Sequence, residues 1–255
     1  MTTDSQSGSS QPKRAVLLFT RAPEQEATRK QIAGTSYAER LTLYRAFITQ
    51  AMREAGATGA DVVVATDEPD FTGFADATYK FRQRGKAFGE RLAFATEKAF
   101  ALGYDEIVII GNDCVDLTGE RLQEAFASLT NHKICFGKAQ DGGVYLIAAR
   151  REVCALLPEL FAACRWETAS VQKDLFSATS GYGFSFAVLG VLNDIDAASD
   201  IIASFNSPLA LLRQLARKLS ARHRCDAPPA LSPFISTRRT LRLRHQKAPP
   251  IALLS

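Results

Sequence analysis

Three runs of branched apolar residues constrain the fold of this chain more than any other feature of its sequence. The runs are RAVLLFT at 14–20, DVVVAT at 61–66 and DEIVIIG at 105–111. Each has the length of one strand, and their nearly continuous Val, Ile and Leu content is typical of strands covered on both faces. Segments with helical periodicity separate them, at 36–57 and 88–102. This order predicts an α/β fold in which helices cover both faces of a mostly parallel sheet.

The second half of the chain continues the alternation less regularly. We expect a further strand at 78–83, a helix over 118–129, two short strands within 133–150, helices near 151–163 and 168–179, and a strand near 184–192. A polar segment that contains glycines joins the two short strands, which favours antiparallel pairing. The predicted sheet is therefore mixed, with a parallel first half and antiparallel later strands.

A short acidic loop, GNDCVDL at 111–117, follows the third apolar run. Ligands of open α/β sheets bind beyond the carboxyl ends of the strands, and Asp113 lies just past such an end. Its carboxylate could cap the next helix, or it could hold a metal ion and the phosphates of a substrate. Asp116 directly precedes the predicted helix, and we expect a structural role for it. We expect no permanent protein cation beside Asp113.

Several familiar activities lack their motifs in this sequence. It contains no Walker loop, no G-x-G-x-x-G after the first strand, no G-x-S-x-G and only three histidines, which argues against a Rossmann dehydrogenase and a serine-triad hydrolase. Acidic residues after strands, basic residues after the first strand, and glycines remain, and these are the parts of a phosphate and metal site. No apolar stretch approaches the roughly 20 residues of a transmembrane segment. The predicted location is cytoplasmic.

Charge divides the chain into segments. The net charge is +4, and the part from Asn206 onward contains ten Lys or Arg and one Asp, so this part carries +9 and the remainder −5. We expect a disordered segment at 1–13, one catalytic or binding domain at 14–204, and a basic C-terminal helix and tail at 205–255. The tail is either solvated or in contact with an anionic membrane surface. It carries no nucleic-acid-binding signature, so we expect no nucleic-acid partner.

Six segments in a fixed order resemble one family of transferases. They are FTRAP (19–23), GERL (89–92), GNDCVDL (111–117), FGKAQDGGVYLIAA (136–149), RWET (165–168) and NDIDAASDI (193–201). Together they resemble the GT-A-like family of radical-SAM/selenodomain-associated transferases, within the nucleotide-diphospho-sugar transferase superfamily. The resemblance covers about residues 14–204. That superfamily contains both nucleotide-sugar glycosyltransferases and small nucleotidyltransferases.

The resemblance implies a metal-dependent, glycosyltransferase-like enzyme with a nucleotide-diphospho-sugar donor and a small-molecule acceptor that the sequence does not specify. It implies Mg²⁺ or Mn²⁺ held by Asp113 and Asp196, because a hard cation with oxygen ligands can neutralise a diphosphate leaving group. The residues that it implies for binding the nucleotide and its phosphates are Arg21, Arg29, Gly111 and Asn112. A nucleotidyltransferase acting on a nucleoside triphosphate, and a catalytically degenerate nucleotide-binding protein, remain as alternatives.

The same resemblance implies that Asp113 and Asp141 are catalytic and that Gly142, Gly143 and Trp166 bind the acceptor. Each of these residues also has a purely structural interpretation. The segment AQDGG is a common turn sequence, and the tryptophan could simply pack in the core. Asp196 could cap a helix at 197–204 instead of binding a metal.

The segment after the first strand departs from the family pattern. Relatives have a longer loop of the form R-A-P-x-x-G-x-x-K-T-R, whereas this chain has RAPEQEATRK, which is two residues shorter and lacks the glycine. Arg21 and Arg29 can still be aligned with the basic residues of that pattern. Glu24 and Glu26 are additions, and we expect their charges to repel a phosphate.

Overall fold

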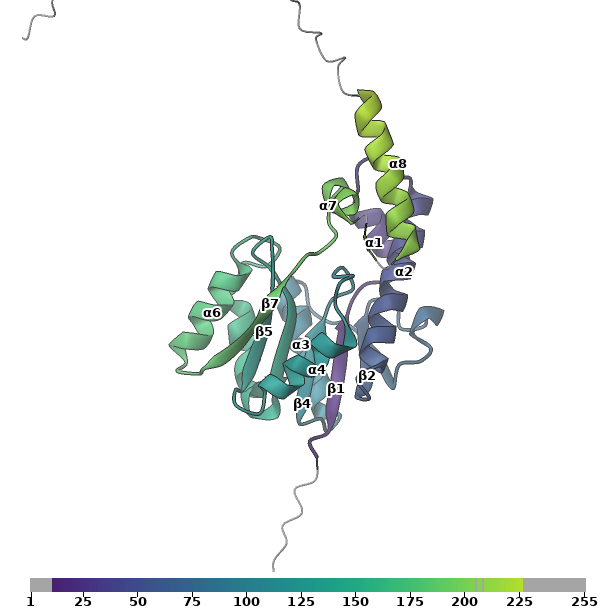
Figure 1. The fold of residues 1–255 in the computed structure, drawn as a ribbon. Coiled ribbons are helices and arrows are strands. Elements are labelled where there is room, and N and C mark those ends of the chain that lie inside the picture. Colours follow the sequence, from purple (N-terminus) through teal and green to yellow (C-terminus); the bar gives the residue numbers. More distant parts are fainter. Residues whose placement is uncertain (1–10, 205, 208, 227–255) are drawn as a thin grey trace, which may run out of the picture.

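A seven-stranded sheet forms the centre of the molecule (Figure 1). The computed structural model describes residues 11–204, 206–207 and 209–226. The strands follow one another across the sheet in the order β3-β2-β1-β4-β6-β5-β7. In chain order they are β1 (Arg14–Phe19), β2 (Asp61–Thr66), β3 (Tyr79–Arg82), β4 (Glu106–Ile110), β5 (Ile134–Ala139), β6 (Val144–Arg150) and β7 (Phe186–Leu192).

The sheet is mixed, as the sequence predicts. β1 pairs in parallel with β2 and β4, and β2 pairs in parallel with β3. β6 is antiparallel to both of its neighbours, β4 and β5, while β7 is again parallel to β5. The antiparallel pairing of the later strands therefore depends on β6, which returns to the sheet through the tight turn after β5.

Helices cover both faces of this sheet. They are α1 (Pro23–Arg29), α2 (Tyr37–Gly56), α3 (Phe88–Ala101), α4 (Gly119–Ser128), α5 (Leu157–Ala162), α6 (Val171–Gly181), α7 (Ala198–Ala203) and α8 (Ala210–Asp226). Short 3₁₀ turns lie at Thr72–Phe74 and Arg151–Leu156. The predicted helix at 151–163 is thus split, with Pro158 in the first turn of α5, where its missing N–H costs no helical hydrogen bond.

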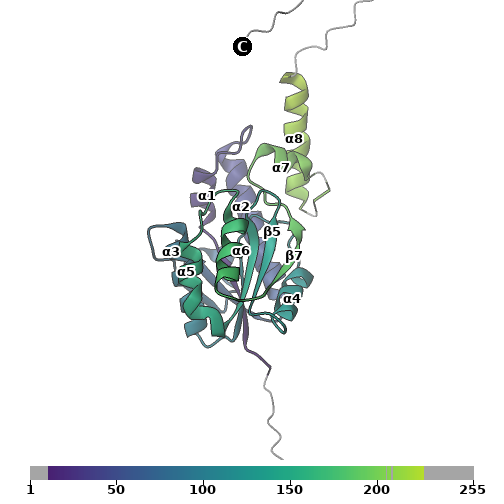
Figure 2. The ribbon, with the colours of Figure 1, turned by 90° about the vertical axis from the view of Figure 1, so that its left-hand side faces the viewer.

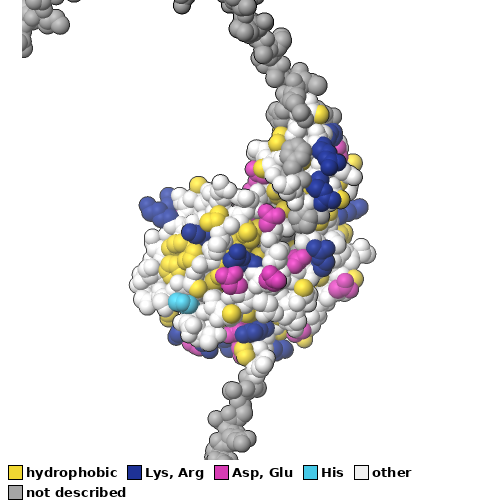
Figure 3. Space-filling view, viewed as in Figure 1, with side chains coloured by type: hydrophobic (Ala, Val, Ile, Leu, Met, Phe, Trp, Pro, Cys, Tyr) yellow, Lys and Arg dark blue, Asp and Glu magenta, His cyan; other side chains and the backbone are white. Residues whose placement is uncertain are grey.

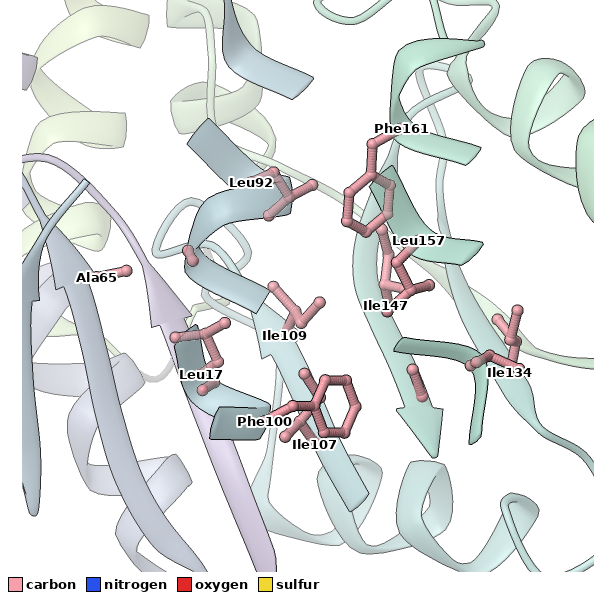
Figure 4. Packing of buried hydrophobic residues seen from close by; sticks show 14 of the residues in the cluster. Leu17, Ala65, Leu92, Phe100, Ile107, Ile109, Ile134, Ile147, Leu157 and Phe161 are labelled. Atoms are coloured by element: carbon pink, nitrogen blue, oxygen red, sulfur yellow. The ribbon is translucent and has the colours of Figure 1, made fainter. Parts of the chain in front are cut away.

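The side chains of β1 show why both faces are apolar. Ala15 and Leu17 pack into a cluster with α3, α5 and α6, part of which Figure 4 shows. Val16 and Leu18 pack on the opposite face against α2 and α4. Because successive side chains of a strand point to opposite faces, a strand covered on both sides must be apolar throughout.

A third cluster joins the C-terminal helices to the body of the molecule. Side chains of α7 and α8 pack there against α1 and α2, and α8 extends beyond the upper end of the sheet (Figures 1 and 2). Ser36 and Glu39 form a capping box at the start of α2, and Lys218 of α8 forms a hydrogen-bonded ion pair with Glu39. The hydrogen bond that Lys218 donates to Glu39 is the main reason why the pKa of Glu39 is lowered to about 2.

The domain boundaries inferred from the sequence stay predictions. α8 lies beyond the predicted boundary at residue 204, and Lys and Arg side chains mark its surface in Figure 3. Most of the predicted N-terminal segment (1–10) and residues 227–255 of the basic tail lie outside the described residues. Among the helices of the described residues, none combines the length and the apolar character needed to span a bilayer.

Candidate functional site

The loops after β1 and β4 meet where the order of the strands reverses. The chain proceeds from β1 to β2 and β3 on one side of the sheet, and β4 then begins the other side. Near their carboxyl ends the two strands pair in parallel, with Leu18 opposite Ile110. Open α/β sheets bind ligands in the crevice at such a switch point. The residues that follow Phe19 and Ile110 therefore form the centre of the candidate site.

A buried glutamate holds the two predicted phosphate-binding arginines. Arg21 donates from Nη1 to Oε1 of Glu26 over 3.0 Å, and Arg29 donates from Nη2 to Oε2 over 3.3 Å. Glu26 is thus paired with two of the predicted phosphate-binding cations, and the expectation that its charge repels a phosphate stays a prediction. Glu24 instead pairs with Arg45, 2.7 Å away. The short helix α1 makes this possible, since it places Glu26 and Arg29 one turn apart.

Arg91 adds a third guanidinium that the sequence analysis did not identify. It lies on α3, where its Nη1 donates to the carbonyl of Lys86 over 2.9 Å. Burial, followed by the positive charges of Arg21 and Arg29, lowers the pKa of Arg91. The three like charges raise one another's energy, and a bound anion would relieve that repulsion. The segment GERL contained the signal, but it was noted only as part of the family pattern.

A cavity of about 200 Å³ opens beside the three arginines. Its wall is largely aromatic and aliphatic, and includes Phe19, Phe88, Leu146 and Trp166. Asn112 also lines it, although this residue is only 7% exposed, and its Nδ2 has no hydrogen-bond partner among the described residues. A buried donor without a partner costs about 1–3 kcal/mol. A ligand with an acceptor atom would remove that cost if the buried Nδ2 turned toward the cavity.

Two further predicted residues line the same cavity. Trp166 donates from Nε1 to the carbonyl of Phe161 over 2.7 Å, and its ring centroid lies 4.9 Å from that of Phe88. It thus both packs in the structure and contributes to the cavity wall. Gly111 lines the cavity as well, and a Cβ atom at this position would meet nothing within 4 Å. Packing of the protein therefore does not require glycine there.

Lys30 lies between the two predicted metal ligands. Its Nζ is 2.5 Å from Oδ2 of Asp113 and 2.6 Å from Oδ1 of Asp196. Burial alone would lower the pKa of Lys30, but the charges and hydrogen bonds of the two carboxylates outweigh it and raise that pKa. The lysine is therefore cationic at neutral pH. The expectation that Asp113 has no protein cation beside it is wrong.

Backbone hydrogen bonds also hold the segments that carry Lys30, Asp113 and Asp196. Asp113 follows β4 and Asp196 follows β7, and the N–H of Ile195 donates to the carbonyl of Asp113 over 3.1 Å. Lys30 immediately follows α1, where its own N–H donates to the carbonyl of Glu26 over 2.9 Å. The ammonium thus joins three segments that are far apart in the sequence.

Asp194 stands between this site and a second, acidic cavity of about 500 Å³. Burial, followed by the charges of Asp113, Asp141 and Asp196, raises the pKa of Asp194 to about 7. The second cavity is lined by further polar side chains, among them Asp116, Gln140, Asp141, Asn193, Asp196 and Asp200. Asp116 does not cap α4, because the hydroxyl of Thr118 accepts the N–H of Arg121 there.

The predicted acceptor segment forms a tight turn beside the second cavity. Oδ1 of Asp141 accepts the N–H of Gly143 over 2.8 Å. Gly142 has a φ of 93°, and a Cβ atom there would lie 2.3 Å from the carbonyl oxygen of Ala169. The glycine is thus required by its backbone conformation and by a protein neighbour. A role of these residues toward an acceptor stays a prediction.

Comparisons with known proteins agree with this fold. A family described as "Uncharacterized protein conserved in bacteria (DUF2064)" matches residues 49–168. No curated protein matches the sequence. The structure of a candidate nucleotide-diphospho-sugar transferase from Desulfovibrio desulfuricans G20 is similar with a TM-score of 0.70, at 25% identity over 82% of this chain and 98% of that one. The narrower family that the sequence resembles stays a prediction.

A more distant neighbour shows the same architecture. The 4-diphosphocytidyl-2C-methyl-D-erythritol synthase of Anaerococcus prevotii DSM 20548 is similar with a TM-score of 0.53, at 7% identity over 82% of this chain and 97% of that one. At this identity the likeness concerns the fold alone. The mixed sheet of this chain is thus the GT-A-like arrangement that the sequence predicts.

The side chains at the switch point do not fit a divalent metal ion as they are arranged. Within the described part of the chain, no group of three or more His, Cys, Asp or Glu side chains is placed to hold one. The ammonium of Lys30 already occupies the space between Asp113 and Asp196. The metal role of these two carboxylates therefore stays a prediction from the resemblance.

Asp113→Asn should destabilise the protein, because it removes one of the two carboxylates that hold Lys30. The side chain of Lys30 is only 15% exposed, and the change would leave it with the more exposed Asp196 as its partner. Loss of one partner of such a pair costs about 1–3 kcal/mol. Thermal unfolding should show a midpoint several degrees lower, while Asp116→Asn in the same loop should leave it unchanged. An unchanged midpoint for Asp113→Asn would show that the ion pair does not stabilise the fold.

Asp194→Asn should have the opposite effect, which should grow between about pH 4 and pH 7 and be complete above that range. The folded-state pKa of about 7 lies above the ordinary value of 3.8, so the protonated carboxyl favours folding at low pH and this contribution is lost as the pH rises toward 7. The amide should therefore raise the free energy of unfolding at pH 8 by roughly 1–2 kcal/mol, after allowance for solvent screening. Urea unfolding at pH 4 and pH 8 measures this difference. An equal effect at both pH values would contradict it.

Proposed function

We propose that this chain binds a nucleotide-diphospho-sugar at the switch point between β1 and β4 and transfers the sugar to a small-molecule acceptor. The observation that carries the proposal is the convergence of Arg21, Arg29 and Arg91 on a cavity that Asn112 also lines, with an Nδ2 that has no hydrogen-bond partner in the described part of the chain. Such a cavity offers cations for a diphosphate and an apolar wall with one directed donor for a base. The candidate transferase with the TM-score of 0.70 supports the same assignment.

The arginines would hold the diphosphate and stabilise it as a leaving group. Guanidinium groups bind phosphate oxygens through pairs of parallel N–H donors. Arg21 and Arg29 are positioned in advance by Glu26, so little freedom is lost when a ligand binds. In the transfer step the bond between the sugar carbon and the phosphate oxygen breaks, and the electron pair stays on the diphosphate, whose charge the arginines offset.

Asn112 and the aromatic wall would bind the base. The rings of Phe88 and Trp166 present flat apolar surface to the cavity, and Nδ2 of Asn112 can donate to a carbonyl oxygen or a ring nitrogen of a base. This arrangement gives one directed hydrogen bond within an apolar pocket, which is typical of small-molecule sites.

Asp194 would act as the general base for the acceptor. It borders both cavities, and its pKa of about 7 suits proton transfer at neutral pH. The acceptor, bound in the second cavity, would give its proton to Asp194 as its oxygen or nitrogen forms the new bond to the sugar carbon. Asp141, which lines the same cavity, would accept a hydrogen bond from an acceptor hydroxyl.

A ligand panel tests the proposal. We expect nucleotide-diphospho-sugars to raise the thermal unfolding midpoint more than the matching nucleoside triphosphates or sugars do. Arg91→Ala should weaken the preferred ligand by about 10-fold to 100-fold, because a charge-assisted hydrogen bond contributes about 1.5–3 kcal/mol. Arg45→Ala is the matched control, since Arg45 pairs with Glu24 and does not line the cavity.

The other outcomes distinguish the alternatives. A clear preference for triphosphates would favour a nucleotidyltransferase. Tight binding of nucleotide-diphospho-sugars without sugar transfer to any acceptor would favour a nucleotide-binding protein. No shift with any nucleotide would refute the proposal.

A further inference from the structure

We infer that Lys30 is the resident cation of this site, joining the acidic loops in place of a divalent ion, so that nucleotide binding needs no metal. The inference deepens the proposed function and rests on it where nucleotides are concerned. Its structural part, that Lys30 excludes a metal ion from Asp113 and Asp196, stands on the geometry of the ion pairs alone.

The distances from Lys30 to the two carboxylates show that only one cation fits between Asp113 and Asp196. An ion bound by both carboxylates would lie about 2.0–2.6 Å from their oxygens. The Nζ atom of Lys30 lies 2.5 Å from Asp113 and 2.6 Å from Asp196. The two cations would therefore occupy nearly the same point, and a metal could enter only if the lysine left.

Displacement of Lys30 from the two carboxylates would be costly, because both its backbone and its side chain are held in place. Its backbone ends α1, whose Ala27 is buried in the third cluster, and its side chain is 15% exposed. Withdrawal of the ammonium would also leave the partly buried Asp113 without this partner, and its buried Oδ1 already lacks a hydrogen-bond partner among the described residues. The bound lysine thus competes with an ion from a position fixed by the fold.

The lysine also performs the task that an ion would have at this edge of the sheet. The loops after β4 and β7 both carry carboxylates, and without a cation they would repel each other and any diphosphate nearby. Lys30 joins the two loops and offsets part of their charge. Less of that repulsion would then act on the phosphates that the arginines bind.

Binding of Mn²⁺ by the full chain tests the structural part, with the electron paramagnetic resonance signal of free Mn²⁺ as the readout. Wild-type protein should leave the signal unchanged. Lys30→Met, which keeps the length of the side chain but not its charge, should bind Mn²⁺ at least about tenfold more tightly, a difference of about 1.4 kcal/mol. The double variant Lys30→Met, Asp113→Asn should lose that binding. Lys133→Met, which removes an exposed partner of Glu152, is the control.

Two results would overturn the structural part. One is Mn²⁺ binding by the wild type that Asp113→Asn abolishes. The other is a Lys30→Met protein that unfolds cooperatively but gains no affinity for Mn²⁺. If Lys30→Met does not fold, the wild-type titration still decides, because it needs no variant of Lys30.

Nucleotide affinity tests the claim that nucleotide binding needs no metal. It also separates that claim from the proposed function. With UDP, CDP, GDP and dTDP as probes, the dissociation constant of the best ligand should agree within about twofold between EDTA and Mn²⁺. A gain of about tenfold or more with Mn²⁺ would refute metal-independent binding. If none of the nucleotides binds in either buffer, the proposed function fails, and the claim of metal-independent binding falls with it. The Mn²⁺ titration then still decides whether Lys30 excludes an ion.

Discussion

The ion pairs of Lys30 with Asp113 and Asp196 are the interaction on which the rest of the site depends. Two carboxylates at the ends of separate strands, in a partly buried position, would destabilise each other without a cation between them. The lysine brings this cation from the end of α1, at distances of 2.5 and 2.6 Å. It thereby fixes α1 against the sheet, and α1 in turn places Glu26 and its two arginines beside the cavity.

This arrangement divides the site by charge. Arg21, Arg29 and Arg91 line the first cavity together with its aromatic wall, and the second cavity is lined by several acidic side chains. Asp194 borders both. An anionic donor and a proton-releasing acceptor would therefore meet at Asp194, whose pKa of about 7 allows it to exchange a proton at neutral pH. The division follows from the switch point, because loops from both halves of the sheet converge there.

The sequence predicts the fold well because the strands are recognisable from their nearly continuous apolar residues. Val16, Leu18 and their counterparts in β2 and β4 are apolar on both faces, which a covered parallel sheet requires. The position of Asp113 beyond β4 followed from the same pattern. Pro23, by contrast, marked the start of α1, but the segment after β1 was compared only with a loop of the family pattern, so the helix was missed.

The contacts of the site were less accessible to sequence reasoning. Lys30 is 83 and 166 residues away from its two partners, and no local pattern predicts such a pairing. The pairing of Glu26 with Arg21 and Arg29 was not predicted, because the sequence does not show which cations a carboxylate contacts in the fold. Arg91 lay within a recognised segment, but only the folded chain shows that it faces Arg21 and Arg29.

The direct test of the central claim is a crystal structure of the full chain grown with its best nucleotide and excess Mn²⁺, with anomalous data to locate the ion. The account predicts phosphate oxygens on Arg21, Arg29 and Arg91, the Lys30 ammonium between Asp113 and Asp196, and no manganese peak at that place. A manganese ion bound to Asp113, with Lys30 displaced from the two carboxylates, would contradict it.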